Sequence, residues 1–255
     1  MIRSFPLLLT TLSLSVLLAV PTIAGAAEVK VICTHALTPA VEQLKVDYDR
    51  STGNKLVIID ATSADAMKRI QGGESFDLAI LLGPAIRDLA KQGKLDPASV
   101  ADLAITGVGI AVKKGAPKPD ISTVPAFRKT LLTAKSIAYS EAGGSGLYFA
   151  EVVNRMGLTE QLKPKTTLVG GGGAVGPLAV SGKIELAVQM KSELYAVKGV
   201  DYVGPLPGEY GKAFLFSAGI FNNSKNAAGA KSLIQLLRSK KAEPVLLSTG
   251  MDLVK

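Results

Sequence analysis

The sequence is poor in the residues that several classes of protein depend on. Among its 255 residues there is one cysteine, one histidine and no tryptophan, and aromatic residues make up 5%. The single cysteine, Cys33, has no partner for a disulfide, and we expect it to be a small buried hydrophobic residue on a strand. One histidine and one cysteine offer no cluster of soft metal ligands, so we expect neither a metal site nor a cofactor.

Acidic residues are outnumbered by basic ones, 21 against 29, which gives a formal net charge of +8. The excess is scattered along the chain and forms no basic block. Because aromatic residues are also scarce, the sequence does not support binding of nucleic acid by base stacking over a basic groove. A positive field does suit the attraction of a small anion.

Long apolar runs are also missing, except at the amino terminus. Residues 1–3 include Arg3, residues 7–20 are apolar apart from Thr and Ser, and Ala24-Gly25-Ala26 is a small-residue cleavage site. This pattern predicts a secretory signal peptide, residues 1–26, cut after Ala26 or Ala27. We therefore expect an exported mature chain that is not inserted in a membrane. Loss of Arg3 with the leader changes the net charge from +8 to +7.

What the chain does contain is a repeated order of apolar strand, small polar turn and helix. Alternating strands and helices of this kind predict an α/β fold built on a mainly parallel sheet with helices on both faces. The four predicted strand-and-turn units occupy residues 28–39, 55–65, 137–146 and 166–177.

The turn at residues 140–146, Ser-Glu-Ala-Gly-Gly-Ser-Gly, is the most informative of the four. It precedes a predicted helix, with Ser145 placed to cap it, and the free N–H groups of a helix start attract anions. Most Ser/Gly turns bind nothing, so this turn alone favours a plain helix start. The recurrence of the same order in three other segments favours an anion site.

The turn at residues 170–177 contains four consecutive glycines and ends at Pro177. Such a run lets backbone approach a ligand closely, and the alternative is a flexible loop. It is not a phosphate-binding loop, because no Gly-Lys-Ser/Thr follows, and it is not a dinucleotide fingerprint.

Two strands have the character of crossings between two lobes, one at residues 107–112 and one at 213–221. We therefore expect residues 27–106 to form the first part of lobe 1, residues 107–216 to form lobe 2, and residues 217–255 to complete lobe 1. Ligands of open α/β sheets bind outside the carboxyl ends of the strands. All four polar turns follow strands, so we expect them to meet in one cleft between the lobes.

Five short motifs are spread over nearly the whole mature chain, at residues 31–37, 61–64, 76–79, 144–148 and 246–251. In their order and spacing the chain resembles the periplasmic molybdate-binding proteins, which are type II solute-binding proteins of ABC importers. The resemblance implies a two-lobed hinge protein that encloses an oxyanion with hydroxyl and backbone N–H groups.

The resemblance also implies site residues. The family's first ligand serine aligns with Ala36, where Thr34 or His35 could supply the missing group, and its second aligns with Ser63, next to Thr62. Backbone donors fall on Ser145, next to Gly144, and on Ala174 or Val175, while Gln189 replaces the family's tyrosine. Such changes around a bound anion alter selectivity strongly. The expected ligand is a small anion: molybdate, tungstate or an organic carboxylate.

An enzyme on the same scaffold is the alternative, because the family also resembles a periplasmic aconitate isomerase. Shifting a proton next to a double bond needs a general base, for which His35 and Glu141 are the candidates. A hydrogen-bonding role or a ligand contact is the other reading of His35, and a helix-start carboxylate that of Glu141. We expect a monomeric periplasmic receptor that works with an inner-membrane ABC permease, with the isomerase as alternative.

Overall fold

The computed structural model describes residues 26–170 and 175–254, so the expected signal peptide lies outside the described residues. The elements confirm an α/β fold in which helices follow strands. In chain order the strands and helices are β1 (Glu28–Thr34), α1 (Thr38–Thr52), β2 (Lys55–Ala61), α2 (Ser63–Gln71), β3 (Leu78–Leu82), α3 (Gly83–Lys91), β4 (Ala101–Lys113), α4 (Val124–Thr133), β5 (Ile137–Ser140), α5 (Gly144–Arg155), α6 (Thr159–Leu162), β6 (Thr166–Val169), α7 (Val175–Val180), β7 (Leu186–Met190), α8 (Lys191–Tyr195), β8 (Val200–Pro205), β9 (Ala213–Ile220), α9 (Ala227–Leu237), α10 (Glu243–Ser248) and β10 (Asp252–Leu253).

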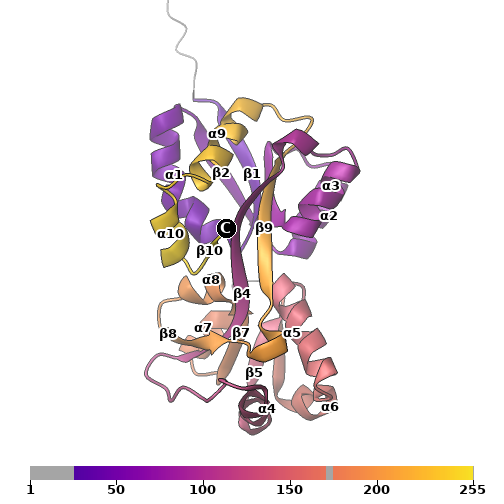
Figure 1. The fold of residues 1–255 in the computed structure, drawn as a ribbon, viewed down its shortest axis with the longest axis vertical. Coiled ribbons are helices and arrows are strands. Elements are labelled where there is room, and N and C mark those ends of the chain that lie inside the picture. Colours follow the sequence, from indigo (N-terminus) through magenta and orange to yellow (C-terminus); the bar gives the residue numbers. More distant parts are fainter. Residues whose placement is uncertain (1–25, 171–174, 255) are drawn as a thin grey trace, which may run out of the picture.

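The described strands form one ten-stranded sheet with the order β2-β1-β3-β9-β4-β7-β5-β6, and β8 and β10 also pair with β4. Strand β1 is parallel to β2 and β3, and β5 is parallel to β6 and β7. Figure 1 shows the result as two lobes, one around β1 and β2 and the other around β5 and β7, with β4 and β9 running from one to the other.

The two crossing strands are antiparallel partners. The first half of β4 pairs with β9, from Ala101 opposite Ala218 to Gly107 opposite Ala213. The second half of β4 pairs with β7 and β8. The lobe boundaries expected from the sequence, 106/107 and 216/217, thus fall within these two strands. Two hydrogen-bonded strands form the connection between the lobes.

The sheet of the first lobe is covered on both faces, as the alternation in β1 shows. Val31 and Cys33 belong to the same buried cluster as Leu44 of α1 and Leu233 of α9. Ile32, which points to the opposite face, packs in the cluster of α2 and α3. Side chains alternate between the two faces of a strand, so one strand contributes to two cores. Cys33 is fully buried, and burial raises the pKa of its thiol to about 12.

The tail of the chain is fixed to the first lobe by buried polar contacts. The Tyr48 hydroxyl of α1 donates to the Gly229 carbonyl of α9 at 3.0 Å. The Asp77 carboxylate, just before β3, accepts from the Ser224 hydroxyl and from the backbone N–H groups of Lys225 and Asn226. Burial raises the pKa of Asp77, but the hydrogen bond from the Lys30 N–H together with these three bonds outweighs it, so the pKa is lowered. The contacts of Tyr48 and Asp77 join the segment that leads into α9 to α1 and to the start of β3.

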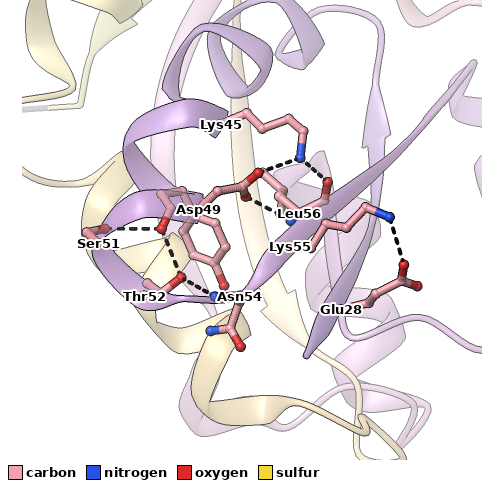
Figure 2. A network of polar contacts seen from close by, with 9 residues as sticks. Glu28, Lys45, Asp49, Ser51, Thr52, Asn54, Lys55 and Leu56 are labelled. Atoms are coloured by element: carbon pink, nitrogen blue, oxygen red, sulfur yellow. Dashed lines mark hydrogen bonds and ion pairs between the residues drawn. The ribbon is translucent and has the colours of Figure 1, made fainter. Parts of the chain in front are cut away.

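A polar network holds the end of α1 against the start of β2 (Figure 2). The Asp49 carboxylate accepts from the Leu56 backbone N–H and from the Lys45 ammonium, both at 2.9 Å. The Thr52 hydroxyl accepts from the Asn54 N–H at 3.1 Å, at the turn where α1 ends. The network fixes the direction of β2 and hence the corner that follows it.

In residues 26–170 and 175–254, no helix has the length and apolar character needed to span a membrane.

Candidate functional site

A small pocket lies where strand ends of the two lobes meet. From the first lobe it is lined by residues at the β1–α1, β2–α2 and β3–α3 corners, and from the second by the β5–α5 and β7–α8 corners, with Phe216 of β9 between them. The residues that line it are Thr34, His35, Ala36, Ala61, Thr62, Ser63, Leu82, Gly143, Gly144, Ser145, Met190, Glu193 and Phe216.

The hydroxyls of the first lobe differ in what they already bind. Thr62 is the N-cap of α2, and its hydroxyl oxygen accepts from the Asp65 N–H at 3.0 Å. Ser63, one residue on, lines the pocket at the first position of the helix. Thr34 is 4% exposed, and its buried hydroxyl oxygen has no hydrogen-bond partner among the described residues. A buried unpaired hydroxyl costs free energy, which a ligand atom in the pocket would recover.

Alanine at position 36 leaves this corner with one hydroxyl fewer than the resemblance implied. Ala36 is 5% exposed and lines the pocket. Its neighbours Thr34 and His35 line the pocket as well, so both groups that could replace the missing hydroxyl are present there.

The glycine-rich turn of the second lobe begins α5, although not through the expected cap. The N-cap is Gly143, and the Ser140 hydroxyl accepts from the Gly143 N–H at 2.9 Å. Ser145 is therefore inside the first turn, where its N–H has no acceptor within the helix. A side chain at Gly146 would overlap the Ser140 carbonyl oxygen. Glycine is required here because helix and strand backbones approach so closely.

The two lobes touch at this pocket. A methyl group placed on Gly144 would lie 3.3 Å from Leu82 Cδ1 and 3.7 Å from Ser63 Oγ, both in the first lobe. The space open to the centre of a water-sized sphere is about 20 Å³. That is room for one or two water molecules. The structure thus has the lobes closed around a site for a small group.

His35 is the first of two titratable groups in the pocket. Its Nδ1 lies 2.6 Å from Asp60 Oδ2 at the end of β2, and the side chains are 20% and 46% exposed. The hydrogen bond to Asp60 raises the pKa of His35, partial burial opposes this, and the charges of Asp60, Glu193 and Asp65 add to the rise. His35 therefore favours the protonated, cationic form more than a free histidine does.

Glu193 is the second titratable group in the pocket, and it was not among the site residues predicted from the sequence. It lies in the first turn of α8, accepts from the Met190 N–H at 3.1 Å, and accepts a hydrogen bond from the Ser145 hydroxyl. Burial raises the pKa of its carboxyl to about 7, and the nearby charge of His35 opposes the rise. The available signal was a polar residue shortly after the end of a buried strand, at the corner that follows Gln189.

Three residues expected at the site are not part of the pocket lining. Gln189 is 1% exposed within β7, so the β7–α8 corner reaches the pocket through Met190 and Glu193 instead. Val175 is fully buried in the cluster that includes Ala111 and Ala138, because it faces the sheet at the start of α7. Glu141 is exposed, since it follows β5 on the outer side of the turn.

Ala174 and Gly173, which belong to the fourth expected corner, lie outside the described residues. The structure therefore brings together three of the four corners, and the β7–α8 corner joins them. No group of three or more His, Cys, Asp and Glu side chains suited to a metal ion occurs among the described residues.

Comparisons with known proteins agree with this geometry. The family described as bacterial extracellular solute-binding protein matches residues 29–252. An aconitate isomerase from Pseudomonas sp is 32% identical over 253 residues, which cover 95% of this chain and 96% of that protein. The molybdate-binding protein ModA of Azotobacter vinelandii is 23% identical over 235 residues, 90% of this chain and 92% of that protein.

The fold has solved counterparts as well. The structure of the Azotobacter vinelandii periplasmic molybdate-binding protein superimposes with a TM-score of 0.76 at 19% identity, and covers 89% of this chain and 100% of that one. The two-lobed type II binding-protein fold expected from the sequence is thereby confirmed. This chain belongs to the bacterial extracellular solute-binding proteins.

Proposed function

We propose that this chain is the periplasmic receptor of an ABC importer and that it holds a small anion between its two lobes. The signal peptide directs it out of the cytoplasm, and the mature chain acts as a monomer that delivers its ligand to a membrane permease. A ligand bound better by the closed form than by the open form drives closure.

The observation that carries the proposal is the convergence of helix starts and a buried unpaired hydroxyl on one small pocket. The first turns of α2 and α5 approach it from opposite lobes, with Ser63 and Ser145 in the lining. Helix N-termini attract anions through free N–H groups and the helix dipole. The hydroxyl of Thr34, unpaired among the described residues, supplies a donor between them.

Most of the donors assigned to the ligand are neutral. We assign the hydroxyls of Thr34 and Ser63 and the backbone N–H groups of Gly144 and Ser145 to the anion, with His35 as a cationic contact from the first lobe. Ala174, Val175 and Gln189 are not assigned to the anion in this arrangement. Preorganised donors of this kind cost little reorganisation on binding.

The test is a thermal shift of the mature chain with molybdate, tungstate, sulfate, citrate and cis-aconitate, followed by calorimetry with those that stabilise it. A ligand of the native state raises the melting temperature by mass action. We expect at least one anion to raise it and Ser63→Ala together with Thr34→Val to reduce the shift. No shift with any of the five would overturn the proposal.

A second candidate is isomerisation of a tricarboxylate, which the pair His35 and Glu193 favours. The pKa of His35 is raised by its hydrogen bond to Asp60, that of Glu193 is raised to about 7 by burial, and the two side chains line the same pocket from opposite lobes. One could remove a proton from carbon while the other returns a proton at the far end of the double bond, as general acid–base catalysis requires. The likeness to an aconitate isomerase at 32% identity supports this candidate.

The size of the pocket separates the two candidates. About 20 Å³ of open space suits a compact oxyanion, whereas a tricarboxylate would need the lobes to part. Incubation with cis-aconitate, followed by chromatography of the isomers, tests the enzyme directly. Turnover that is lost in His35→Ala and in Glu193→Gln would favour the isomerase, and binding of cis-aconitate without turnover would favour the receptor.

A further inference from the structure

We propose that Glu193 makes ligand binding proton-coupled: the pocket closes on an anion together with one proton, which the Glu193 carboxyl holds and donates to the anion. This inference rests on the proposed function, because it concerns how the same pocket accepts negative charge. It assigns to Glu193 the role of a selectivity residue.

The residues that line the pocket include a carboxylate, which in its ionised form would repel a bound anion. Among the described residues that line the pocket, Glu193 is the single carboxylate, and none is Lys or Arg. A carboxylate facing the oxygen of an anion sets two like charges and two acceptors against each other, with no hydrogen between them. In a pocket of low dielectric such a pair is strongly unfavourable. A proton on Glu193 turns the same contact into a hydrogen bond to the anion.

The carboxyl is held so that one oxygen is already committed as an acceptor. Oε2 accepts from the Met190 N–H at 3.1 Å, at the start of α8. The Ser145 hydroxyl, in the first turn of α5, also donates to the carboxyl. The first contact fixes the carboxyl within the β7–α8 corner, and the second ties it to the β5–α5 corner. We therefore assign the proton to the other oxygen, Oε1.

The charges around Glu193 come from both lobes. His35 faces it from the β1–α1 corner and favours the ionised carboxylate, whereas Asp60, at the end of β2, disfavours it. Asp65 of α2 acts on His35. On α8 itself, the Lys191 ammonium is paired with Asp252 at 3.0 Å. Burial is the largest influence, and it raises the pKa of Glu193 to about 7.

The coupling has a definite sign. Below about pH 7 the carboxyl already holds its proton, so an anion binds without uptake. Above that pH the closed complex must take one proton from solvent, and the dissociation constant should rise about tenfold for each further pH unit. Deprotonation of His35 weakens anion binding in the same direction, so the two residues must be separated by substitution.

Calorimetry of the mature chain tests the proposal, with whichever of molybdate, tungstate, sulfate, citrate or cis-aconitate binds tightest as the probe. The titrations run from pH 5.5 to 8.5 in two buffers of different ionisation enthalpy, which reports the protons taken up after correction for the probe's own titration. We expect the wild type to take up about one proton at pH 8. Glu193→Gln, which keeps an acceptor for Met190 and offers a permanent N–H donor, should take up fewer protons than the wild type, the remainder coming from His35, and should bind at least as tightly at pH 8.

Two further variants complete the experiment. His35→Gln should retain uptake that depends on Glu193, and Glu160→Gln, at an exposed site outside the pocket, should match the wild type. Binding without proton uptake, or equal uptake in His35→Gln and in the double variant His35→Gln/Glu193→Gln, would overturn this inference and leave the receptor proposal standing. Failure of all five anions to bind at every pH would overturn both.

Discussion

The two sides of the pocket hold their titratable groups in opposite ways. On the first-lobe side, His35 is paired with a half-exposed carboxylate, Asp60, at 2.6 Å, and that partner stabilises its positive charge. On the second-lobe side, Glu193 is partly buried at the pocket, and loss of solvent destabilises its negative charge. The hydrogen-bond partner Asp60 raises the pKa of His35, whereas desolvation raises the pKa of Glu193.

Although the two causes differ, both raise a pKa, and both therefore make the pocket more favourable to an anion. Both groups hold their protons to a higher pH than the free side chains do. Near neutral pH the pocket is therefore more positive than a lining with one histidine and one glutamate suggests. A pocket without Lys or Arg among its described lining residues can accept an anion in this way.

The largest effect should come from the backbone of the second-lobe side. In Gly146→Ala the new methyl group would overlap the Ser140 carbonyl oxygen, so α5 must move away from β5. We expect a loss of about 3 kcal/mol or more in the free energy of unfolding, as for severe overpacking. Chemical denaturation measures it. Gly170→Ala, where no atom of the described residues lies within 4 Å of the added methyl group, is the matched control, and equal losses in the two variants would contradict the close approach.

Removing one or the other of two first-lobe hydroxyls should affect the stability of the free protein and its affinity for the anion differently. Thr34→Val removes a hydroxyl that is buried and unpaired among the described residues, so the free protein should be as stable as the wild type or more stable. Its affinity for the anion should fall about tenfold, as for one lost hydrogen bond. Both are measured by denaturation and calorimetry on one sample.

Thr62→Val is the counterpart, because this hydroxyl caps α2. The free energy of unfolding should fall by about 1 kcal/mol, the usual value of an N-cap. If Thr34→Val instead destabilised the free protein by as much as Thr62→Val, the Thr34 hydroxyl would have a partner and could not be reserved for a ligand.

A smaller effect should follow from removing the partner of His35. Because the chain has one histidine, proton NMR of an untagged sample reports its titration without ambiguity. Asp60→Asn should lower the pKa of His35 toward or below 6.5, since its largest stabilising contact is lost. Asp88→Asn, at a distant exposed site, should leave the titration unchanged.

The same substitution predicts a change in pH dependence. His35 binds its proton more tightly in the folded chain, so its contribution to stability is complete below about pH 6.5 and is lost as the pH rises through the higher folded pKa. Asp60→Asn should flatten this loss. An unchanged slope of stability between pH 6 and 8 would contradict the assigned pairing.

The smallest effect should come from Glu141→Gln. This carboxylate is exposed and outside the pocket lining, so anion affinity and its pH dependence should match the wild type. A change as large as that of Glu193→Gln would show that the wrong carboxylate has been placed at the ligand.

Much of the fold could be predicted from the sequence, because the local signals are strong. Apolar runs rich in β-branched residues and followed by polar turns mark β1 and β2, and Gly144-Ser145-Gly146 marks the start of α5. Corners that follow parallel strands lie at one edge of a sheet, so Thr34, Ser63 and Ser145 could be expected to come together.

The rest depended on tertiary packing that local patterns do not encode. Ser145 does not cap α5, because the Ser140 hydroxyl satisfies the first free N–H from outside the helix. Gln189 is directed into the core by the register of β7 against β4, opposite Gly109. Glu193 reaches the pocket only because the short helix α8 begins directly after that strand.

The most direct measurement of the central claim is a crystal structure of the mature chain with the tightest-binding anion of the five. The account predicts closed lobes and electron density for the anion in hydrogen-bond contact with Thr34, Ser63 and the N–H of Ser145, with one Glu193 oxygen within 3.0 Å of the ligand. Density elsewhere on the molecule, or an anion in the pocket that avoids both Thr34 and Ser145, would contradict it.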